Sequence, residues 1–262
     1  MDLELAKRVG IAAAYQAGSV LRSHFGSISE VKKKGVIDLV TEADIASERV
    51  IFDIIRKTFP DHDILGEESG LNKGKGRCKW IVDPLDGTTN FAHQLSIFSV
   101  SIAFGIKDEI LVGIVLNPIS GELFTAIKGK GALLNCSPIK VSNSKKVSES
   151  LLVTGFPYDF KKILTPLLTR FTHCLEASLG VRRLGSAALD LCFVACGRFG
   201  GFWEQNLNPW DTAAGVLIAK EAGAVITDFP NKSFAVDKNE ILATNGKIHK
   251  EMLALLKLKD TV

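Results

Sequence analysis

A short apolar segment leads directly into an acidic turn at residues 80–91, which read Trp-Ile-Val-Asp-Pro-Leu-Asp-Gly-Thr-Thr-Asn-Phe. The apolar part predicts a buried strand that ends at Asp83, at the sheet edge where open α/β sheets commonly bind ligands. Pro84 fixes its own φ and removes a hydrogen-bond donor, so the chain turns there. The turn can bring Asp83, Asp86 and the Leu85 carbonyl towards one point, which predicts a polar site at the end of a strand.

The residues after this turn add donors for an anion. Gly87 permits close approach of the backbone, and Thr88 and Thr89 favour the start of a helix that their hydroxyls can cap. A helix that begins here directs unpaired N–H groups at an anion. The alternative is an ordinary acidic turn, which the agreement of proline, glycine and threonines disfavours. The segment therefore predicts oxygen ligands for a cation beside donors for a phosphate.

Further carboxylates can join this turn from distant positions. Glu67 ends the preceding predicted strand, and Asp211 follows a tryptophan and opens a predicted helix. If these two acids converge with Asp83 and Asp86, each like-charge pair at about 4 Å costs roughly 1 kcal/mol in water and about 4 kcal/mol at an effective dielectric near 20. Bound cations relieve that repulsion, and a shell of oxygen ligands favours Mg²⁺ or Mn²⁺ over Zn²⁺.

Composition narrows the class of protein. The chain has 262 residues, enough for one large domain or two packed halves, and its formal net charge of +3 gives no strong reason to expect nucleic acid or an acidic membrane as the main partner. No apolar run approaches the roughly 18 residues that cross a bilayer. The five cysteines are scattered, which fits reduced thiols in the cytoplasm. Cys192 and Cys196 are interpreted as core residues on one helix.

Hydrophobic periodicity predicts layered helices and sheets. Thr41 with Asp44 resembles a capping box at the start of the second helix. Without the other acids, Asp44 is interpreted as a capping carboxylate and Glu68 as a surface carboxylate. Residues 71–76 are predicted to be a mobile surface loop. The predicted helices cover residues 3–25, 41–59, 165–177, 186–197, 212–222 and 247–256. The predicted strands cover residues 63–66, 80–82, 97–105, 109–116, 122–126, 132–135, 151–154, 201–204, 224–227 and 241–243.

Four segments resemble motifs of the inositol monophosphatase family, and they occur in the family's order. They are residues 38–44, residues 66–69, residues 80–93 and residues 210–215. The resemblance covers essentially the whole chain. It implies an α+β fold, the layered αβαβα sandwich of inositol monophosphatases and fructose-1,6-bisphosphatases, in a single domain over residues 1–262. A metal and phosphate half is expected over about residues 1–140 and a substrate half over about 141–262.

The resemblance also implies roles for particular residues. The implied metal ligands are Glu67, Asp83, the Leu85 carbonyl, Asp86 and Asp211. Asp86 and the N–H groups of Gly87 and Thr88 would bind phosphate. Thr88, held by Asp44, would orient the attacking water, with Glu67 as a further catalytic residue. Glu204, Ala187 and Asp211 would contact the hydroxyls of a polyol, and Lys33 matches a family lysine near the site.

These features together predict hydrolysis of a small polyol phosphate, most specifically inositol 1-phosphate. Water activated by two or three Mg²⁺ ions, with Mn²⁺ as a substitute, would attack phosphorus directly. The resemblance implies lithium sensitivity and a cytoplasmic homodimer. One alternative is a fructose-1,6-bisphosphatase or a broad polyol phosphatase. Another is a regulatory protein that binds RNA or the transcription machinery, for which Lys145, Lys146, Arg182 and Arg183 supply charge, although their default interpretation is a solvated surface.

Overall fold

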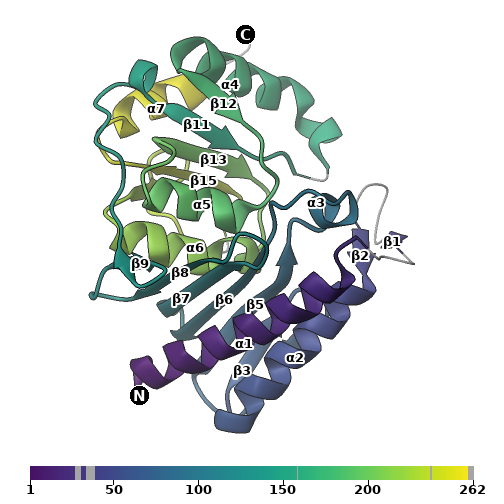
Figure 1. The fold of residues 1–262 in the computed structure, drawn as a ribbon. Coiled ribbons are helices and arrows are strands. Elements are labelled where there is room, and N and C mark those ends of the chain that lie inside the picture. Colours follow the sequence, from purple (N-terminus) through teal and green to yellow (C-terminus); the bar gives the residue numbers. More distant parts are fainter. Residues whose placement is uncertain (27–30, 34–38, 158, 237, 259–262) are drawn as a thin grey trace.

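Layers of helix and sheet alternate through the molecule (Figure 1). This computed structural model describes residues 1–26, 31–33, 39–157, 159–236 and 238–258, and the side chains of residues 31–33 and 39–41 lie outside that description. From one side to the other run a helix pair, an eight-stranded sheet, a second helix pair, a five-stranded sheet and a third helix pair. The predicted α+β fold, a layered αβαβα sandwich, is therefore confirmed.

The helices form the outer and middle layers of the sandwich. The pair α1 and α2 packs on the outer face of the first sheet, α5 and α6 lie between the sheets, and α4 and α7 cover the second sheet (Figure 1). Their bounds are α1 (Leu3–His24), α2 (Glu42–Thr58), α3 (Thr88–Ala92), α4 (Leu164–Ala177), α5 (Ala187–Ala195), α6 (Pro209–Glu221) and α7 (His249–Leu256), with 3-10 turns at Val147–Glu149 and Phe160–Ile163. No helix in the described ranges combines the length and the apolar character that a bilayer crossing requires.

The first sheet positions the acidic turn. Its strand order is β10-β9-β8-β7-β6-β5-β3-β4. The bounds are β3 (Asp63–Gly66), β4 (Gly70–Asn72), β5 (Cys78–Asp86), β6 (Ser99–Ile106), β7 (Glu109–Asn117), β8 (Glu122–Ile127), β9 (Ala132–Leu134) and β10 (Ser137–Pro138). Strands β3 and β5 are parallel, with Gly66 opposite Val82, so the residues that follow them meet at one edge of the sheet.

The second sheet has five strands in the order β12-β11-β13-β15-β14. Their bounds are β11 (Leu151–Thr154), β12 (Gly180–Arg182), β13 (Gly201–Gln205), β14 (Val225–Thr227) and β15 (Glu240–Thr244). The first sheet ends at Pro138 and the second begins at Leu151, beside the expected division near residue 140. A single domain with a metal half and a substrate half stays a prediction.

Several short elements differ from the sequence prediction. The loop predicted over residues 71–76 is wrong at its beginning, because β4 covers Gly70–Asn72 and pairs antiparallel with β3. Strand β12 and the two-stranded ribbon of β1 (Val31–Lys33) and β2 (Leu39–Thr41) were not predicted. Each of these strands has three residues, too few for a period of two to be visible.

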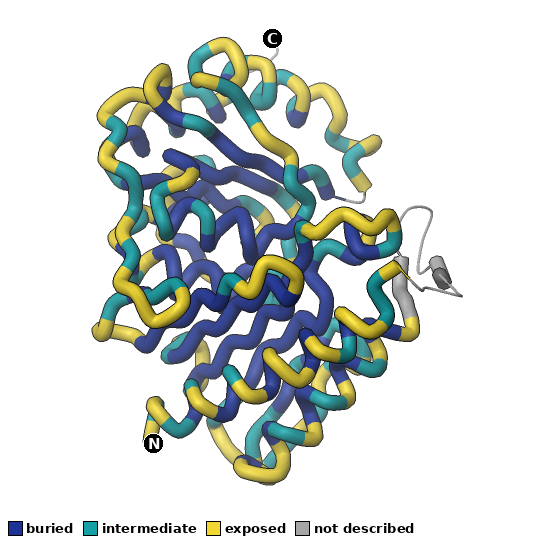
Figure 2. Tube along the Cα trace, in the orientation of Figure 1, coloured by how far each residue is buried: buried dark blue, intermediate teal, exposed yellow. Residues whose placement is uncertain are grey.

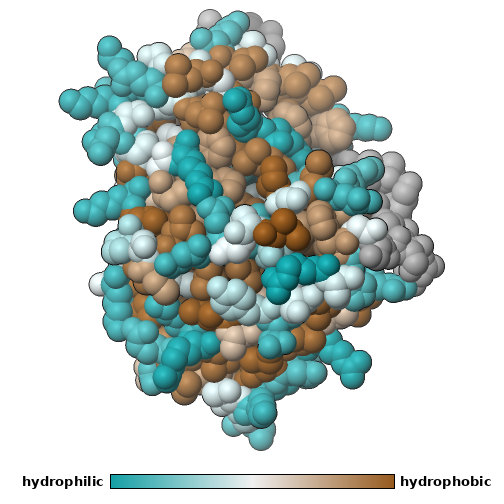
Figure 3. Space-filling model, viewed as in Figure 1, coloured by the Kyte–Doolittle hydropathy of each residue, from teal (hydrophilic) through white to brown (hydrophobic). Residues whose placement is uncertain are grey.

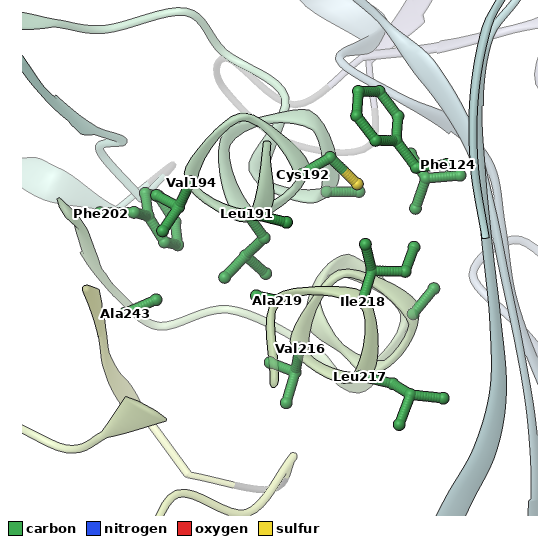
Figure 4. Close-up of a cluster of buried hydrophobic side chains, with 14 of the residues drawn as sticks. Phe124, Leu191, Cys192, Val194, Phe202, Val216, Leu217, Ile218, Ala219 and Ala243 are labelled. Atoms are coloured by element: carbon green, nitrogen blue, oxygen red, sulfur yellow. The ribbon is translucent and has the colours of Figure 1, made fainter. Parts of the chain in front are cut away.

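Three apolar clusters hold the layers together. Alanines of α1 and the larger side chains of Ile51, Phe52 and Ile55 in α2 pack on the first sheet, whose central strands are buried (Figure 2). The central cluster joins α5 and α6 to both sheets (Figure 4). Cys192 is buried in this cluster, as predicted, while Cys196 is only partly buried. Because α5 and α6 are buried on most of their surfaces, the residues at their N-termini are fixed between the two sheets.

Candidate active site

The parallel strands β3 and β5 bring the first two acids together. Glu67 follows β3 directly, and its main-chain N–H donates a hydrogen bond to the Val82 carbonyl at 3.1 Å. Asp83 is the next residue of β5 and is buried. Their side chains share a hydrogen bond, so the two carboxyl groups are in direct contact. The sequence placed both acids at strand ends, but only the parallel pairing makes them neighbours.

The turn after Asp83 is held by hydrogen bonds to its own backbone. The pairing of β5 with β6 is irregular between Asp83 and Asp86. Asp83 Oδ1 accepts the Leu85 N–H at 2.9 Å, and the Pro84 carbonyl accepts the Ser47 hydroxyl of α2 at 3.0 Å. These contacts fix the peptide between the two aspartates, as the proline-containing turn predicted.

Gly87 occupies a position that suits glycine alone. Its φ is +101°, and a Cβ there would lie 3.1 Å from the carbonyl oxygens of Gly185 and Ile97. Gly87 is also the residue that precedes α3, which has no side-chain cap. The predicted capping by Thr88 or Thr89 is therefore wrong. Helix α3 has only five residues, so its dipole is small. It can bind an anion through its backbone N–H groups.

The Thr88 hydroxyl makes other contacts instead. Thr88 Oγ1 lies 3.1 Å from the Leu85 carbonyl oxygen and 3.3 Å from Oδ1 of Asp44, and both acceptors are buried. A hydroxyl has one proton, so it donates to one acceptor at a time and keeps its lone pairs for another donor. The predicted contact between Thr88 and Asp44 is present, and their catalytic roles stay predictions.

The last two acids, Asp86 at the end of β5 and Asp211 in α6, are held at the N-termini of the helices between the sheets. Asp86 Oδ2 accepts the Ser186 hydroxyl at 2.6 Å and the Ala188 N–H at 2.8 Å, at the start of α5. Asp211 Oδ2 accepts the Asn208 N–H at 2.7 Å in a capping box that begins α6. This cap explains why α6 begins at Pro209, three residues before the predicted start.

One cavity of about 300 Å³ collects these groups. Glu67, Asp83, Asp86 and Asp211 line it together with Gly87 and Thr88, which come from β3, β5, α3 and α6. Ala187 and Glu204, the predicted contacts for a polyol, line the same cavity. Of the predicted site residues, Asp44 lies behind Thr88, and the side chain of Lys33 is outside the described part of the chain.

Burial and mutual repulsion make these acids reluctant to ionise. Burial, and then the charges of Glu67, Asp86 and Asp211, raise the pKa of Asp83 well above its usual range. Burial raises the pKa of Asp86 to about 6, against the hydrogen bonds from Ser186 and Ala188, which lower it. Burial and Asp86 also raise the pKa of Asp211. The acids of the cavity therefore repel one another electrostatically, as the sequence predicted for the case in which they converge.

The chemistry of this donor set fits a hard divalent cation. All the side-chain donors are carboxylate oxygens, the preferred ligands of Mg²⁺ and Mn²⁺, and a cation would remove the repulsion that raises their pKa values. As the side chains stand, the described residues contain no group of three or more His, Cys, Asp or Glu arranged to hold a metal ion. The fit to a cation therefore rests on the chemistry of the donors.

The opposite wall of the cavity is built from loops of the second half and from strand β13, which carries Glu204. Gly155 lies against the Glu204 carboxylate, and any side chain at position 155 would overlap it. Burial and the charge of Asp211 raise the pKa of Glu204 to about 8, against the neighbouring Arg183, which lowers it. Glu204 is therefore mostly neutral at pH 7 and can donate as well as accept a hydrogen bond.

The sequence did not indicate a place in the site for two residues near this wall. Arg183 is exposed, as its default interpretation as a surface residue predicted, but it also lines the cavity and lowers the pKa of Glu204 and of Asp190. Asp190 is buried, and neither of its oxygens has a hydrogen-bond partner among the described residues. Burial, and then Glu204, raise its pKa well above the usual range. Only their place in the residue run 182–190 could have drawn attention to them.

Comparisons with known proteins agree with this architecture. Residues 2–259 match the model of the inositol monophosphatase family. An inositol-1-monophosphatase of Synechocystis is 46% identical over 253 residues, covering 96% of this chain and 88% of that protein. The Nus factor SuhB of Haemophilus influenzae is 42% identical over 248 residues, covering 94% and 93%.

A solved structure is similar over nearly the whole length. The extragenic suppressor protein suhB of Bartonella henselae superposes with a TM-score of 0.94 at 38% identity, covering 98% of this chain and 100% of that one. The site is thus that of a phosphatase. The chain belongs to the inositol monophosphatase family.

Proposed function

We propose that this protein hydrolyses the phosphate monoester of a small polyol, most specifically inositol 1-phosphate, to the free polyol and inorganic phosphate. The observation that carries the proposal is the single cavity in which four acids face one another beside Gly87 and Thr88, with Glu204 on the opposite wall. The name of the Synechocystis relative, an inositol-1-monophosphatase, supports the choice of ester. Fructose 1,6-bisphosphate and other polyol phosphates are the alternative substrates.

We infer that Glu67, Asp83, the Leu85 carbonyl, Asp86 and Asp211 hold two or three Mg²⁺ ions. When bound, Mg²⁺ supplies positive charge to the phosphate and lowers the pKa of water. Mn²⁺ would serve as a substitute because its ligand preference is the same. Inhibition by Li⁺ is part of this proposal.

The protein's own groups would position the reactants. Backbone N–H groups of Gly87 and Thr88 would bind phosphate oxygens, with Asp86 beside them. Thr88 Oγ1, by donating to Asp44, keeps its lone pairs free to accept a hydrogen bond from the attacking water and so to orient it. Glu204, Ala187 and Asp211 would contact the hydroxyls of the polyol, and Lys33 would lie near them.

An ester panel tests the proposal. Phosphate release is measured from inositol 1-phosphate, fructose 1,6-bisphosphate and glycerol phosphate at matched Mg²⁺, with and without Li⁺, and after chelation of the metal. We expect the highest kcat/KM with inositol 1-phosphate, inhibition by Li⁺ and no release after chelation. Preference for fructose 1,6-bisphosphate would replace the substrate but keep the site. Release that persists after chelation contradicts the mechanism.

A second candidate function is a role in transcription, which the name of the Haemophilus relative, a Nus factor, favours. The basic residues Lys145, Lys146 and Arg182 are exposed and available for a macromolecular partner, whereas Arg183 lines the cavity. A catalytically inactive Asp83→Asn protein that restores every defect of a gene deletion would favour this second function. Failure of the inactive protein to restore them would favour the phosphatase.

We also propose that two copies associate in the cytoplasm, where the free cysteines remain reduced. Apolar side chains gather on the surface over α4 (Figure 3). The exposed leucines there are Leu164, Leu168, Leu175 and Leu179, and Leu179 is 70% exposed. We expect light scattering to report a dimer, and the double substitution Leu168→Glu with Leu175→Glu to give a monomer. A monomeric parent protein would contradict this proposal.

A further inference from the structure

A second cavity lies along α6 and shares no lining residue with the catalytic cavity. We call it the α6 cavity; it is bounded by α6, by Leu65 of β3, by the first half of β5, by the turn between β6 and β7, and by residues 234–236. Its volume of about 620 Å³ is twice that of the catalytic cavity and falls within the range of roughly 300–1,000 Å³ typical of small-molecule sites.

The floor and one wall of the α6 cavity are apolar. Ile81 lies two residues before Asp83, so both side chains point to the same face of the first sheet. Val216 and Leu217 of α6 meet this floor, and Phe234 closes one side. These four residues are each more than nine-tenths buried. A ligand that fills the cavity therefore needs an apolar body.

The rim of the α6 cavity carries four lysines. Lys128 forms an ion pair with Glu109. For Lys79, Lys107 and Lys220, no ion pair occurs within the described residues. Lys220 is exposed, and partial burial of its ammonium group and the charge of Lys128 lower its pKa.

The acids on the same rim offset only part of this charge. Glu109 is paired with Lys128. Glu221 accepts the N–H groups of Gly129 and Gly131, each at 2.8 Å, so its carboxylate is held in the turn after β8 and keeps its negative charge. Asp108 is the remaining acid of the lining, and it is exposed. Four lysines thus face three carboxylates, which leaves the rim with a formal net charge of +1.

We propose that the α6 cavity binds a small amphipathic anion, with an alkyl or aromatic body on the apolar floor and one carboxylate or phosphate group among Lys79, Lys107 and Lys220. A neutral apolar ligand would leave the net positive charge of the rim unbalanced. A small inorganic anion would leave the buried floor unfilled. This site is separate from the phosphatase centre, so its test does not depend on the proposed activity.

Binding of the fluorescent dye anilinonaphthalene sulfonate, an aromatic body with one anionic group, tests the proposal with the full chain. Two variants alter the cavity at exposed positions: Lys220→Glu reverses a rim charge, and Ala235→Trp fills the space. Lys250→Glu, on exposed α7 surface, is the matched control. We expect each cavity variant to weaken dye binding at least ~10-fold, the equivalent of 1.4 kcal/mol, and the control to bind as the parent does.

Competition between the dye and other anions identifies whether the α6 cavity prefers an alkyl or an aromatic ligand. Displacement of the dye by decanoate indicates an alkyl acid, and displacement by adenosine monophosphate indicates a nucleotide; both support the site. Displacement by inorganic phosphate with Mg²⁺ would mean that the dye occupies the catalytic cavity. That result, or unchanged binding in both folded cavity variants, overturns the proposal, because the dye would then sit elsewhere, such as on the leucines over α4. Circular dichroism establishes that the variants are folded.

Discussion

The two walls of the catalytic cavity are built in different ways. The wall with Glu67, Asp83 and Asp86 stands on two adjacent strand ends, and hydrogen bonds to the main chain fix the turn between its aspartates. The opposite wall, which we call the loop wall, combines Glu204 of strand β13 with loops that are far apart in the sequence, one of which carries Arg183. The first wall therefore holds its acids at adjacent strand ends, whereas most of the loop wall, apart from Glu204, lies outside the sheets. This difference predicts that chemistry depends on the first wall and substrate choice on the second.

The largest effect is expected on the strand-end wall. Asp83→Asn removes a charge that the proposed cations require, so we expect kcat to fall at least ~100-fold for every ester. Because burial and three neighbouring acids make the Asp83 charge unfavourable, the variant should not be less stable. Asp61→Asn, at an exposed acid paired with Lys75, is the control and should keep full activity. Turnover within tenfold of the parent would remove Asp83 from the reaction.

A smaller and more selective effect is expected on the loop wall. Glu204→Ala loses the hydrogen bond proposed to a polyol hydroxyl, so kcat/KM for inositol 1-phosphate should fall about 10-fold or more. Turnover of p-nitrophenyl phosphate, whose leaving group has no hydroxyl, should change little. Because the pKa of Glu204 is raised to about 8, the neutral amide in Glu204→Gln should preserve most activity at pH 7. Equal losses of kcat/KM for both esters would contradict the separate roles of the two walls.

The pH dependence of stability should change when Asp190, behind the loop wall, is replaced. Burial raises the pKa of Asp190 in the folded protein, so its contribution to stability is full below the unfolded pKa near 4 and is lost as pH rises through the folded value. Asp190→Asn cannot ionise. We therefore expect it to be about 1 kcal/mol more stable than the parent at pH 8 and nearly equal at pH 4, by urea denaturation. A less stable variant at pH 8 would show that Asp190 is ionised and paired.

The smallest effect is expected far from both walls, at His249. Its ring nitrogens lie 3.1 Å from Thr227 Oγ1 and 2.9 Å from Thr244 Oγ1, and burial lowers its pKa. The unfolded chain then binds the proton more readily than the folded protein does. The contribution of His249 to stability is therefore fully present above pH 6.5 and decreases as the pH falls below that value. His249→Gln should reduce the loss of stability between pH 7 and pH 5. The pKa of partly buried His62 is also lowered, so some dependence of stability on pH should remain in this variant. An unchanged pH profile would contradict the assignment.

The same contrast explains what could be predicted from the sequence. Asp83, Asp86 and Gly87 lie within five residues, so their turn chemistry is visible in one segment, and strand and helix periods gave most of the layers. The position of Arg183 depends on how a loop before α5 packs against Glu204. The space for Glu204 depends on the absence of a side chain at Gly155. Such contacts have no local pattern.

Tertiary contacts explain the local errors. Thr88 was expected to cap a helix, yet its hydroxyl lies near Asp44, which is 44 residues away in the sequence. Strand β4 has three residues, and pairing with β3 decides its conformation more than its own composition does. Where tertiary contacts outweigh local preference, the sequence pattern misleads.

Anomalous diffraction from crystals soaked in Mn²⁺ and inorganic phosphate locates the cations independently of turnover. We expect Mn²⁺ peaks in the catalytic cavity, ligated by Glu67, Asp83, Asp86 and Asp211, with phosphate beside the Gly87 and Thr88 N–H groups. An active preparation whose crystals show no Mn²⁺ bound to these acids would contradict their proposed role as metal ligands.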